Sequence, residues 1–172
     1  MNTIRTAVRL ADSIRHKLQA QQMNFSTDLK EGQLVERLVA LFLRDRKYRL
    51  LDSFNNDNRY DLHMTNDIHN IKVEVKADRH TYEKADDFLI EFMSNRKPSG
   101  IRTTEADVYA YYYVVEMELY LISVKKLRAF IDEYRPSHCP GGDQNTSEMY
   151  TINRELYKDQ IDYKKLNLND LI

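Results

Sequence analysis

Apolar and charged side chains alternate along residues 70–77, which read NIKVEVKA. Successive side chains of a strand point to opposite faces, so this period of two predicts a strand with one apolar and one charged face. The charged face carries Lys72, Glu74 and Lys76 in a row. Because Glu74 and Lys76 are two positions apart, their side chains leave the same face of the strand.

Helical spacing of apolar residues predicts three long helices, over 3–22, 29–48 and 125–134, the last ended by Pro136. A break is expected at 24–28 (NFSTD), and a short helix is expected over 103–107, with Thr103 or Thr104 as its N-cap. The first helix could pack on the domain, on a second subunit or beside nucleic acid.

Strands follow the second helix, separated by turn-forming residues. They are predicted over 48–54, 59–64, 70–77, 88–92, 108–115 and 119–124. Residues 135–148 are the most loop-like segment. This order predicts the α/β class, with a single mixed sheet flanked by helices.

Composition favours one globular domain. The chain has 172 residues, 42% of them hydrophobic and 31% charged, which suits one domain with a core of its own. We expect an N-terminal helix in 1–25, a core in 30–134, and a loop with a C-terminal extension in 135–172. No apolar run is long enough for a membrane span, and Cys139 is the only cysteine, so a cytoplasmic setting is expected.

Charge is distributed unevenly along the chain. Residues 1–49 carry a net charge of about +5 and the remainder about −6. A basic N-terminal third can face a phosphate backbone. A solvated helical surface explains the same counts, so charge alone does not decide between the two readings.

Asp61 lies on the strand before Glu74, with a turn expected at 65–69 between them. An antiparallel pairing would bring the two carboxylates about 5 Å apart. Carboxylates that close repel one another unless a proton or a cation joins them, and Mg²⁺ accepts one or two carboxylates together with water and phosphate. Lys76 beside such a site can act on a water or on phosphoryl charge. The simpler alternative is an ion pair on a solvated sheet face.

Asp61, the triplet Glu74-Val75-Lys76 and a preceding helix bearing Glu36 together resemble the PD-(D/E)xK nuclease superfamily. The resemblance covers about residues 30–131, includes small phage and mobile-element members, and departs from the pattern at Tyr60, where the superfamily name has proline. It implies a restriction-endonuclease-like αβββαβ core and metal-dependent phosphodiester hydrolysis. It further implies Mg²⁺, or Mn²⁺ as a substitute, held by Asp61, Glu74, Val75 and Glu36.

Other candidates surround this set. Glu91 is expected close behind the metal ligands, and Glu31 competes with Glu36 for the helix position. Lys72, Lys97 and Arg102 are candidate contacts to nucleic acid. We expect a nuclease directed by DNA structure or strand, and the N-terminal helix could join two copies as a homodimer. An RNA-directed endonuclease of the same fold and a non-catalytic binding module remain alternatives.

Overall fold

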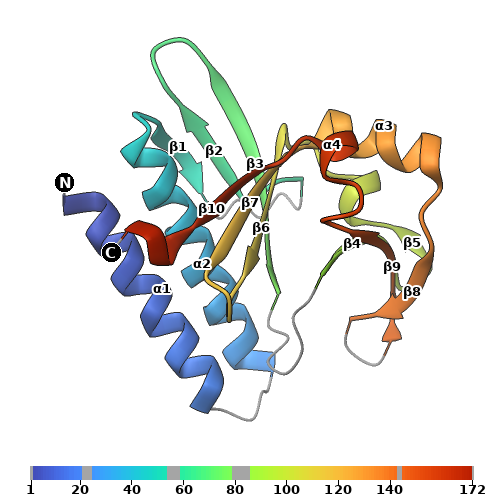
Figure 1. Ribbon diagram of the computed structural model, residues 1–172, viewed down its shortest axis with the longest axis horizontal. Coiled ribbons are helices and arrows are strands. Elements are labelled where there is room, and N and C mark those ends of the chain that lie inside the picture. Colours follow the sequence, from blue (N-terminus) through green and yellow to red (C-terminus); the bar gives the residue numbers. More distant parts are fainter. Residues whose placement is uncertain (1, 21–24, 54–58, 79–85, 143–144, 172) are drawn as a thin grey trace.

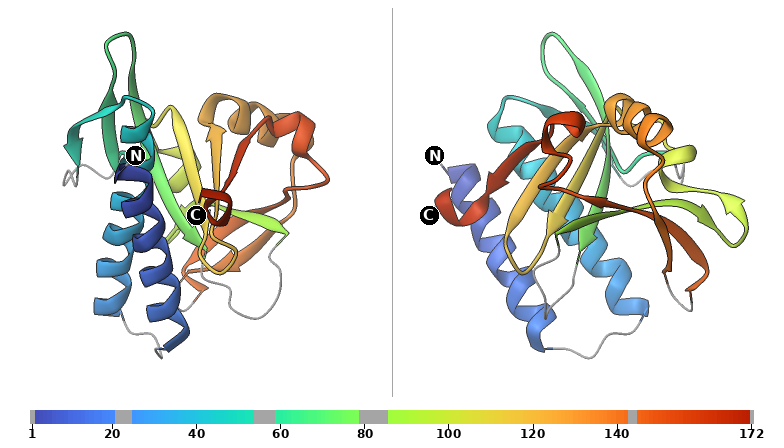
Figure 2. Two further views of the ribbon diagram at one scale, coloured as in Figure 1. Left: turned by 60° about the vertical axis from the view of Figure 1, so that its left-hand side comes forward. Right: turned by 45° about the vertical axis from the view of Figure 1, so that its right-hand side comes forward.

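The computed structural model describes residues 2–20, 25–53, 59–78, 86–142 and 145–171. Two long helices, α1 (Asn2–Ala20) and α2 (Phe25–Asp45), lie side by side on one face of a six-stranded sheet. A four-stranded sheet and the helix α3 (Val124–Tyr134) lie on the other face (Figures 1 and 2). The expected α/β class, with a mixed sheet flanked by helices, is confirmed.

The six-stranded sheet has the order β1-β2-β3-β6-β7-β10. Its strands are β1 (Arg49–Ser53), β2 (Leu62–Thr65), β3 (Asn70–Asp78), β6 (Val108–Tyr113), β7 (Glu118–Ser123) and β10 (Lys164–Asn167). All neighbours are antiparallel except β3 and β6, which are parallel. Parallel strands need a crossover connection, and in the described part of the chain between β3 and β6, residues 86–107, the strands belong to a different sheet.

The sequence reading was wrong in expecting a single sheet. The strand expected at 88–92 is β4 (Asp87–Ser94), and it belongs to a second sheet of order β5-β4-β9-β8. The other strands are β5 (Lys97–Pro98), β8 (His138–Gly141) and β9 (Ser147–Asn153). Part of the expected loop at 135–148 is therefore strand. The short helices α4 (Lys158–Ile161) and η3 (Leu168–Leu171) complete the C-terminal part.

Strand β6 separates two hydrophobic cores. Ala110 and Tyr112 face α1 and α2, whereas Tyr109, Tyr111 and Tyr113 face the four-stranded sheet and α3. The apolar stripe of α1 is buried in the first core, so α1 packs on its own chain, which is the first of the three arrangements considered for it. Of the described residues, no helix combines the length and hydrophobicity that a membrane span requires.

Helix α3 begins and ends close to where its sequence predicts, whereas two other expectations about helices are wrong. Ser123 caps α3 by accepting from the Lys126 N–H, and Arg135 ends it in the left-handed conformation (φ 46°) just before Pro136. The break expected at 24–28 is wrong over 25–28, because α2 already begins at Phe25, and residue 24 lies outside the described residues. No helix forms over 103–107; instead the 3₁₀ turn η1 (Gly100–Arg102) precedes it, and Thr103 is the residue that ends this turn.

Candidate active site

The open end of the β2–β3 hairpin places Asp61 close to Glu74. The register of the two strands ends with the pair Leu62 and Val73, and Asp61 lies one residue before β2, where its charge acts on Glu74. The Asp61 N–H donates at 3.0 Å to the carbonyl oxygen of Val73, the partner of Leu62, so the pairing is irregular at this end. In return the Val75 N–H donates to Asp61 Oδ2 at 2.6 Å. The backbone of β3 therefore fixes the Asp61 carboxylate beside Glu74.

Thr104 anchors Glu74 from the other side. The buried Thr104 hydroxyl lies 3.1 Å from Glu74 Oε2 and 2.9 Å from the Arg59 carbonyl oxygen. Its single proton serves only one of these acceptors at a time. The hydroxyl also accepts from the Ala106 N–H at 3.2 Å. Sequence reasoning treated Thr104 as a helix cap, and no local pattern indicates its contact with a strand thirty positions earlier.

Three carboxyl groups share an environment that disfavours charge. Burial, followed by the charge of Asp61, raises the pKa of Glu74 to about 7, although Lys76 and Thr104 oppose the shift. Burial and Asp61 also raise the pKa of Glu36 to about 7, against the opposing charge of Arg37. Burial raises the pKa of Asp61 as well, against the Val75 hydrogen bond and Lys76. A bound proton or cation stabilises such a cluster, because it relieves the repulsion between the carboxylates.

Glu36 and Lys76 approach this pair from different elements. Half-buried Glu36 extends from α2 and couples to Asp61, so the structure brings these two predicted residues together. Half-buried Lys76 acts electrostatically on both Asp61 and Glu74 and, within the described residues, forms no direct ion pair. The side chain of Val75 packs toward the helices, which leaves only its backbone for the site. The side chain of Glu31 lies outside the described residues.

Glu91 lies across from Glu74 on β4 with both carboxylate oxygens engaged. Ser99 Oγ donates to Oε1 at 2.6 Å, and Ser147 Oγ donates to Oε2 at 2.8 Å. The charge of Glu91 is among those that raise the pKa of Glu74, after burial and Asp61. Glu91 thus borders the carboxylate pair as expected, held by two serines that the sequence reading did not connect to it.

The candidate nucleic-acid contacts divide between two places. Lys72 lies at the rim of the site, over the ring of Tyr60, and its Nζ is 3.2 Å from Glu105 Oε2. Arg59 binds the other oxygen of Glu105 at 2.9 Å. The Lys72 N–H donates to Asp107, which ties the start of β3 to the loop after η1. Lys72 is therefore paired with an exposed carboxylate.

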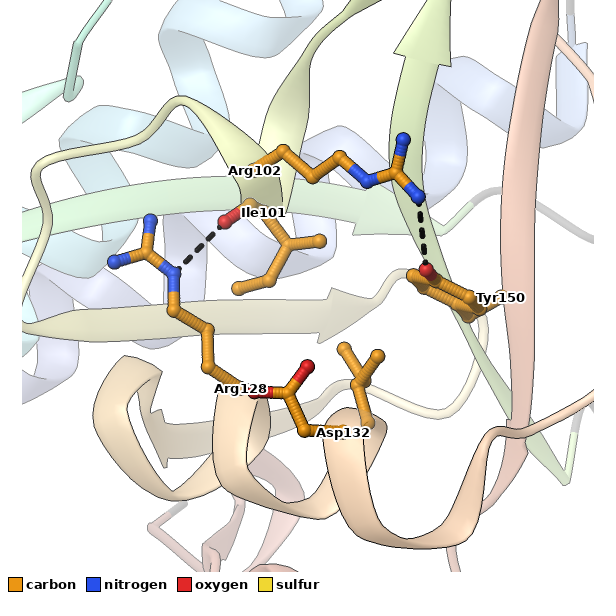
Figure 3. A pocket seen from close by; sticks show the side chains of 6 residues that line it. Ile101, Arg102, Arg128, Asp132 and Tyr150 are labelled. Atoms are coloured by element: carbon orange, nitrogen blue, oxygen red, sulfur yellow. Dashed lines mark hydrogen bonds between the residues drawn. The ribbon is translucent and has the colours of Figure 1, made fainter.

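Lys97 and Arg102 lie elsewhere, on the four-stranded sheet and at the end of η1. The Arg102 guanidinium lies over the Phe92 ring and donates to the Tyr150 hydroxyl at 3.4 Å (Figure 3). In the described part of the chain, no hydrogen bond or ion pair joins either residue to Asp61 or Glu74. The structure does not bring these two residues into the carboxylate cluster.

Arg128 supports the loop that carries Thr104. From α3 it donates to the carbonyl oxygens of Ile101 at 2.9 Å and Thr104 at 2.6 Å. Arg128 extends from the helix toward Ile101 (Figure 3). It lines a surface pocket of about 240 Å³ together with Arg102 and Tyr150. Arg128 of α3 thus holds Thr104, and Thr104 contacts Glu74, so α3 is connected to the site through these two contacts.

The donor set suits a hard divalent cation only in part. Asp61 and Glu74 supply two facing carboxylates with free oxygens, which is a number that Mg²⁺ accepts when water and phosphate complete its shell. Among the described residues, however, no group of three or more histidine, cysteine, aspartate or glutamate side chains is arranged to hold a metal ion. Glu36 as a third ligand stays a prediction.

The sequence matches no protein-family model, and it matches no curated protein. The fold is similar to that of a bacterial homing endonuclease, I-Ssp6803I. The two chains are 21% identical, the match covers 73% of this chain and 78% of that one, and the TM-score is 0.48. At this identity and TM-score the similarity is too weak to indicate a function, so the function is inferred from the residues of the site.

Proposed function

We propose that this protein is a divalent-metal-dependent nuclease that hydrolyses phosphodiester bonds in DNA, directed by structure or strand rather than by a long sequence. The observation that carries the proposal is the register of the β2–β3 hairpin. Asp61 directly precedes β2 in this hairpin and its charge acts on Glu74 of β3, while Lys76 lies two positions further along the same strand. The proposal includes membership of the PD-(D/E)xK superfamily, which is based on these same residues.

Each residue has a separate task in this reading. Asp61 and Glu74 would hold Mg²⁺ or Mn²⁺ between β2 and β3, with Glu36 as an additional acidic group beside Asp61. A divalent cation bound there would polarise the scissile phosphate and lower the pKa of a water molecule. The Lys76 ammonium group orients the attacking water and stabilises the negative charge that develops on the phosphoryl oxygens.

The electrostatics of the carboxylate cluster support the assignment of Asp61 and Glu74. Burial and the charge of Asp61 raise the pKa of Glu74 to about 7, so keeping both carboxylates ionised at neutral pH is unfavourable unless a positive charge is added. A purely structural ion pair on a solvated face would show no such elevation, because an amine alone lowers the pKa of its partner. Strongly shifted carboxylates of this kind are frequent at functional sites.

Incubation with linear, nicked, branched and single-stranded DNA and RNA tests the proposal, with Mn²⁺ or Mg²⁺ and with chelator in parallel. We expect cleavage of at least one DNA substrate that requires the metal and is lost in Glu74→Gln. Cleavage of RNA alone would replace DNA by RNA as the substrate. Salt-sensitive binding without cleavage of any substrate would identify a binding module instead.

A further inference from the structure

Tyr109 carries a buried hydroxyl group that no described residue satisfies. Its side chain has no exposed surface, and its hydroxyl has no hydrogen-bond partner within the described residues. Tyr111 and Tyr113 point to the same side of β6, and both have acceptors: Tyr111 donates to Asp78 at 2.9 Å, and Tyr113 donates to the Asp87 carbonyl oxygen at 2.7 Å. Tyr109 is thus the exception among the three tyrosines on this face.

The parallel pairing of β3 with β6 places Tyr109 directly beside Glu74. Both side chains leave the sheet on the face toward the four-stranded sheet, where Glu91 also lies. Burial, and then the charges of Glu74, Glu91 and Asp61 in that order, raise the pKa of Tyr109 well above its ordinary value. The hydroxyl therefore stays protonated and is available as a donor.

Glu74 offers this donor an open acceptor. Both oxygens of Glu91 already accept from serine hydroxyls, and Asp61 Oδ2 accepts from Val75. For Glu74 the described residues supply one hydrogen bond, from Thr104 to Oε2. Its other oxygen, Oε1, accepts no hydrogen bond from the described residues, and Tyr109, whose hydroxyl is also unpaired there, is the partner of Glu74 on the neighbouring strand.

We propose that Tyr109 is a positioning residue of the cation site, whose hydroxyl donates a hydrogen bond to Glu74 and fixes the orientation of that carboxylate when it binds a divalent cation. The inference rests on the proposed function, because it needs Glu74 to be a ligand. Groups that hydrogen-bond to metal ligands orient them, and losing such a group typically weakens metal binding about 10–100-fold.

The chain provides a matched control on the same strand. Tyr112 is also fully buried and its hydroxyl also lacks a partner within the described residues, but it faces α1 and α2 on the opposite side of the sheet. Tyr112→Phe therefore makes the same chemical change at equal burial, away from the carboxylates. Isothermal titration with Mn²⁺ alone, without nucleic acid, compares the variants, and urea unfolding verifies that each is folded.

We expect Tyr109→Phe to bind Mn²⁺ about tenfold more weakly than the wild type, and Tyr112→Phe to bind it as the wild type does. Replacing Tyr109 with p-aminophenylalanine, which restores an N–H donor at the same ring position, should recover most of the lost affinity. If Tyr109→Phe does not fold, p-fluorophenylalanine at this position, which fills the space of the hydroxyl without a donor, takes its place and should show the same loss. Unchanged affinity in Tyr109→Phe, equal losses in both phenylalanine variants, or no recovery with the amine would each overturn the inference.

Glu74→Gln distinguishes this inference from the function on which it rests. If the wild type binds Mn²⁺ and Glu74→Gln does not, the cation site stands, and the tyrosine variants alone decide the role of Tyr109. If the wild type does not bind Mn²⁺, or Glu74→Gln binds it equally well, the proposed cation site is wrong and the role of Tyr109 is overturned with it.

Discussion

The Val75 N–H donates a 2.6 Å hydrogen bond to Asp61 Oδ2, so the backbone of the strand that carries Glu74 and Lys76 also orients the opposing carboxylate. This bond gives Asp61 two separable properties, a charge and a hydrogen-bond acceptor. A variant that lacks the charge but keeps the acceptor tests the role of Asp61 in catalysis. A variant that lacks both also tests the contribution of the hydrogen bond to stability.

Asp61→Asn and Asp61→Ala should therefore differ in stability but not in activity. Both remove the charge, and both should abolish metal-dependent cleavage. Asparagine retains an oxygen for the Val75 N–H, whereas alanine leaves that donor unsatisfied, a difference of about 1–3 kcal/mol in the free energy of unfolding. Urea denaturation in chelator measures it. Equal stability of the two variants would show that the hydrogen bond contributes little.

Glu74→Gln should change how stability depends on pH in metal-free protein. The pKa of Glu74 rises from 4.5 to about 7 on folding, so the folded state binds this proton more tightly than the unfolded state. The contribution of Glu74 to stability is therefore complete below pH about 4.5 and is lost as the pH rises through about 7.

Glu74→Gln does not ionise, so it should gain stability relative to the wild type as the pH rises from about 4.5 to about 8. Denaturation at several pH values in the presence of chelator measures this difference. Glu133→Gln, an exposed change on α3, is the control and should follow the wild type. A constant difference between Glu74→Gln and the wild type across this range would contradict the raised pKa.

Lys76→Met should separate catalysis from binding. Under the proposed function, Lys76 acts on the attacking water or on the phosphoryl charge, so its loss should reduce turnover by about 10²-fold or more. Affinity for DNA should fall only slightly, because one positive charge among several is lost. Cleavage and filter-binding assays on the same preparations compare it with Lys125→Met, which removes an exposed lysine from α3. Equal turnover in the two variants would mean that Lys76 has no part in the reaction.

Glu105→Gln should strengthen binding to nucleic acid. Glu105 pairs with both Arg59 and Lys72, and neutralising it removes the carboxylate that holds Lys72, so that the Lys72 ammonium group becomes available to phosphates. Affinity should increase, and the slope of log K against log salt should steepen by about 1 for each additional phosphate that the protein neutralises. Fluorescence anisotropy at several salt concentrations measures both quantities, with Glu133→Gln as the control. An unchanged slope would show that Lys72 does not face the substrate.

The sequence predicted the part of the site that depends on local pairing. The alternation of residues 70–77 and the turn before them were sufficient to predict the antiparallel pairing of β2 with β3, because a short antiparallel hairpin has few registers that bury its apolar face. Glu36 was predicted from the resemblance, and its coupling to Asp61 agrees with that expectation.

The remaining contacts depend on pairings between distant segments, which no local pattern encodes. Alternation identified β4 as a strand, but its partner β9 lies beyond α3 in the sequence, so the second sheet was not recognised. For the same reason Ser147 could not be connected to Glu91. Ser26, Thr27 and Asp28 are residue types that favour turns and caps, which led to a break being expected where α2 already begins.

The crossover between β3 and β6 also has a kinetic consequence. The β2–β3 hairpin closes through a short turn and can form within about 1–10 μs, so Asp61, Glu74 and Lys76 should meet early in folding. Tyr109 and Thr104 reach Glu74 only after β6 has docked in parallel across the crossover, a contact between segments far apart in the sequence that forms more slowly. A chain that has folded only as far as the hairpin would bring the three charged groups together without Tyr109 and Thr104 beside Glu74. Under the proposed function, the acquisition of cation affinity should therefore report the last step of folding rather than the first.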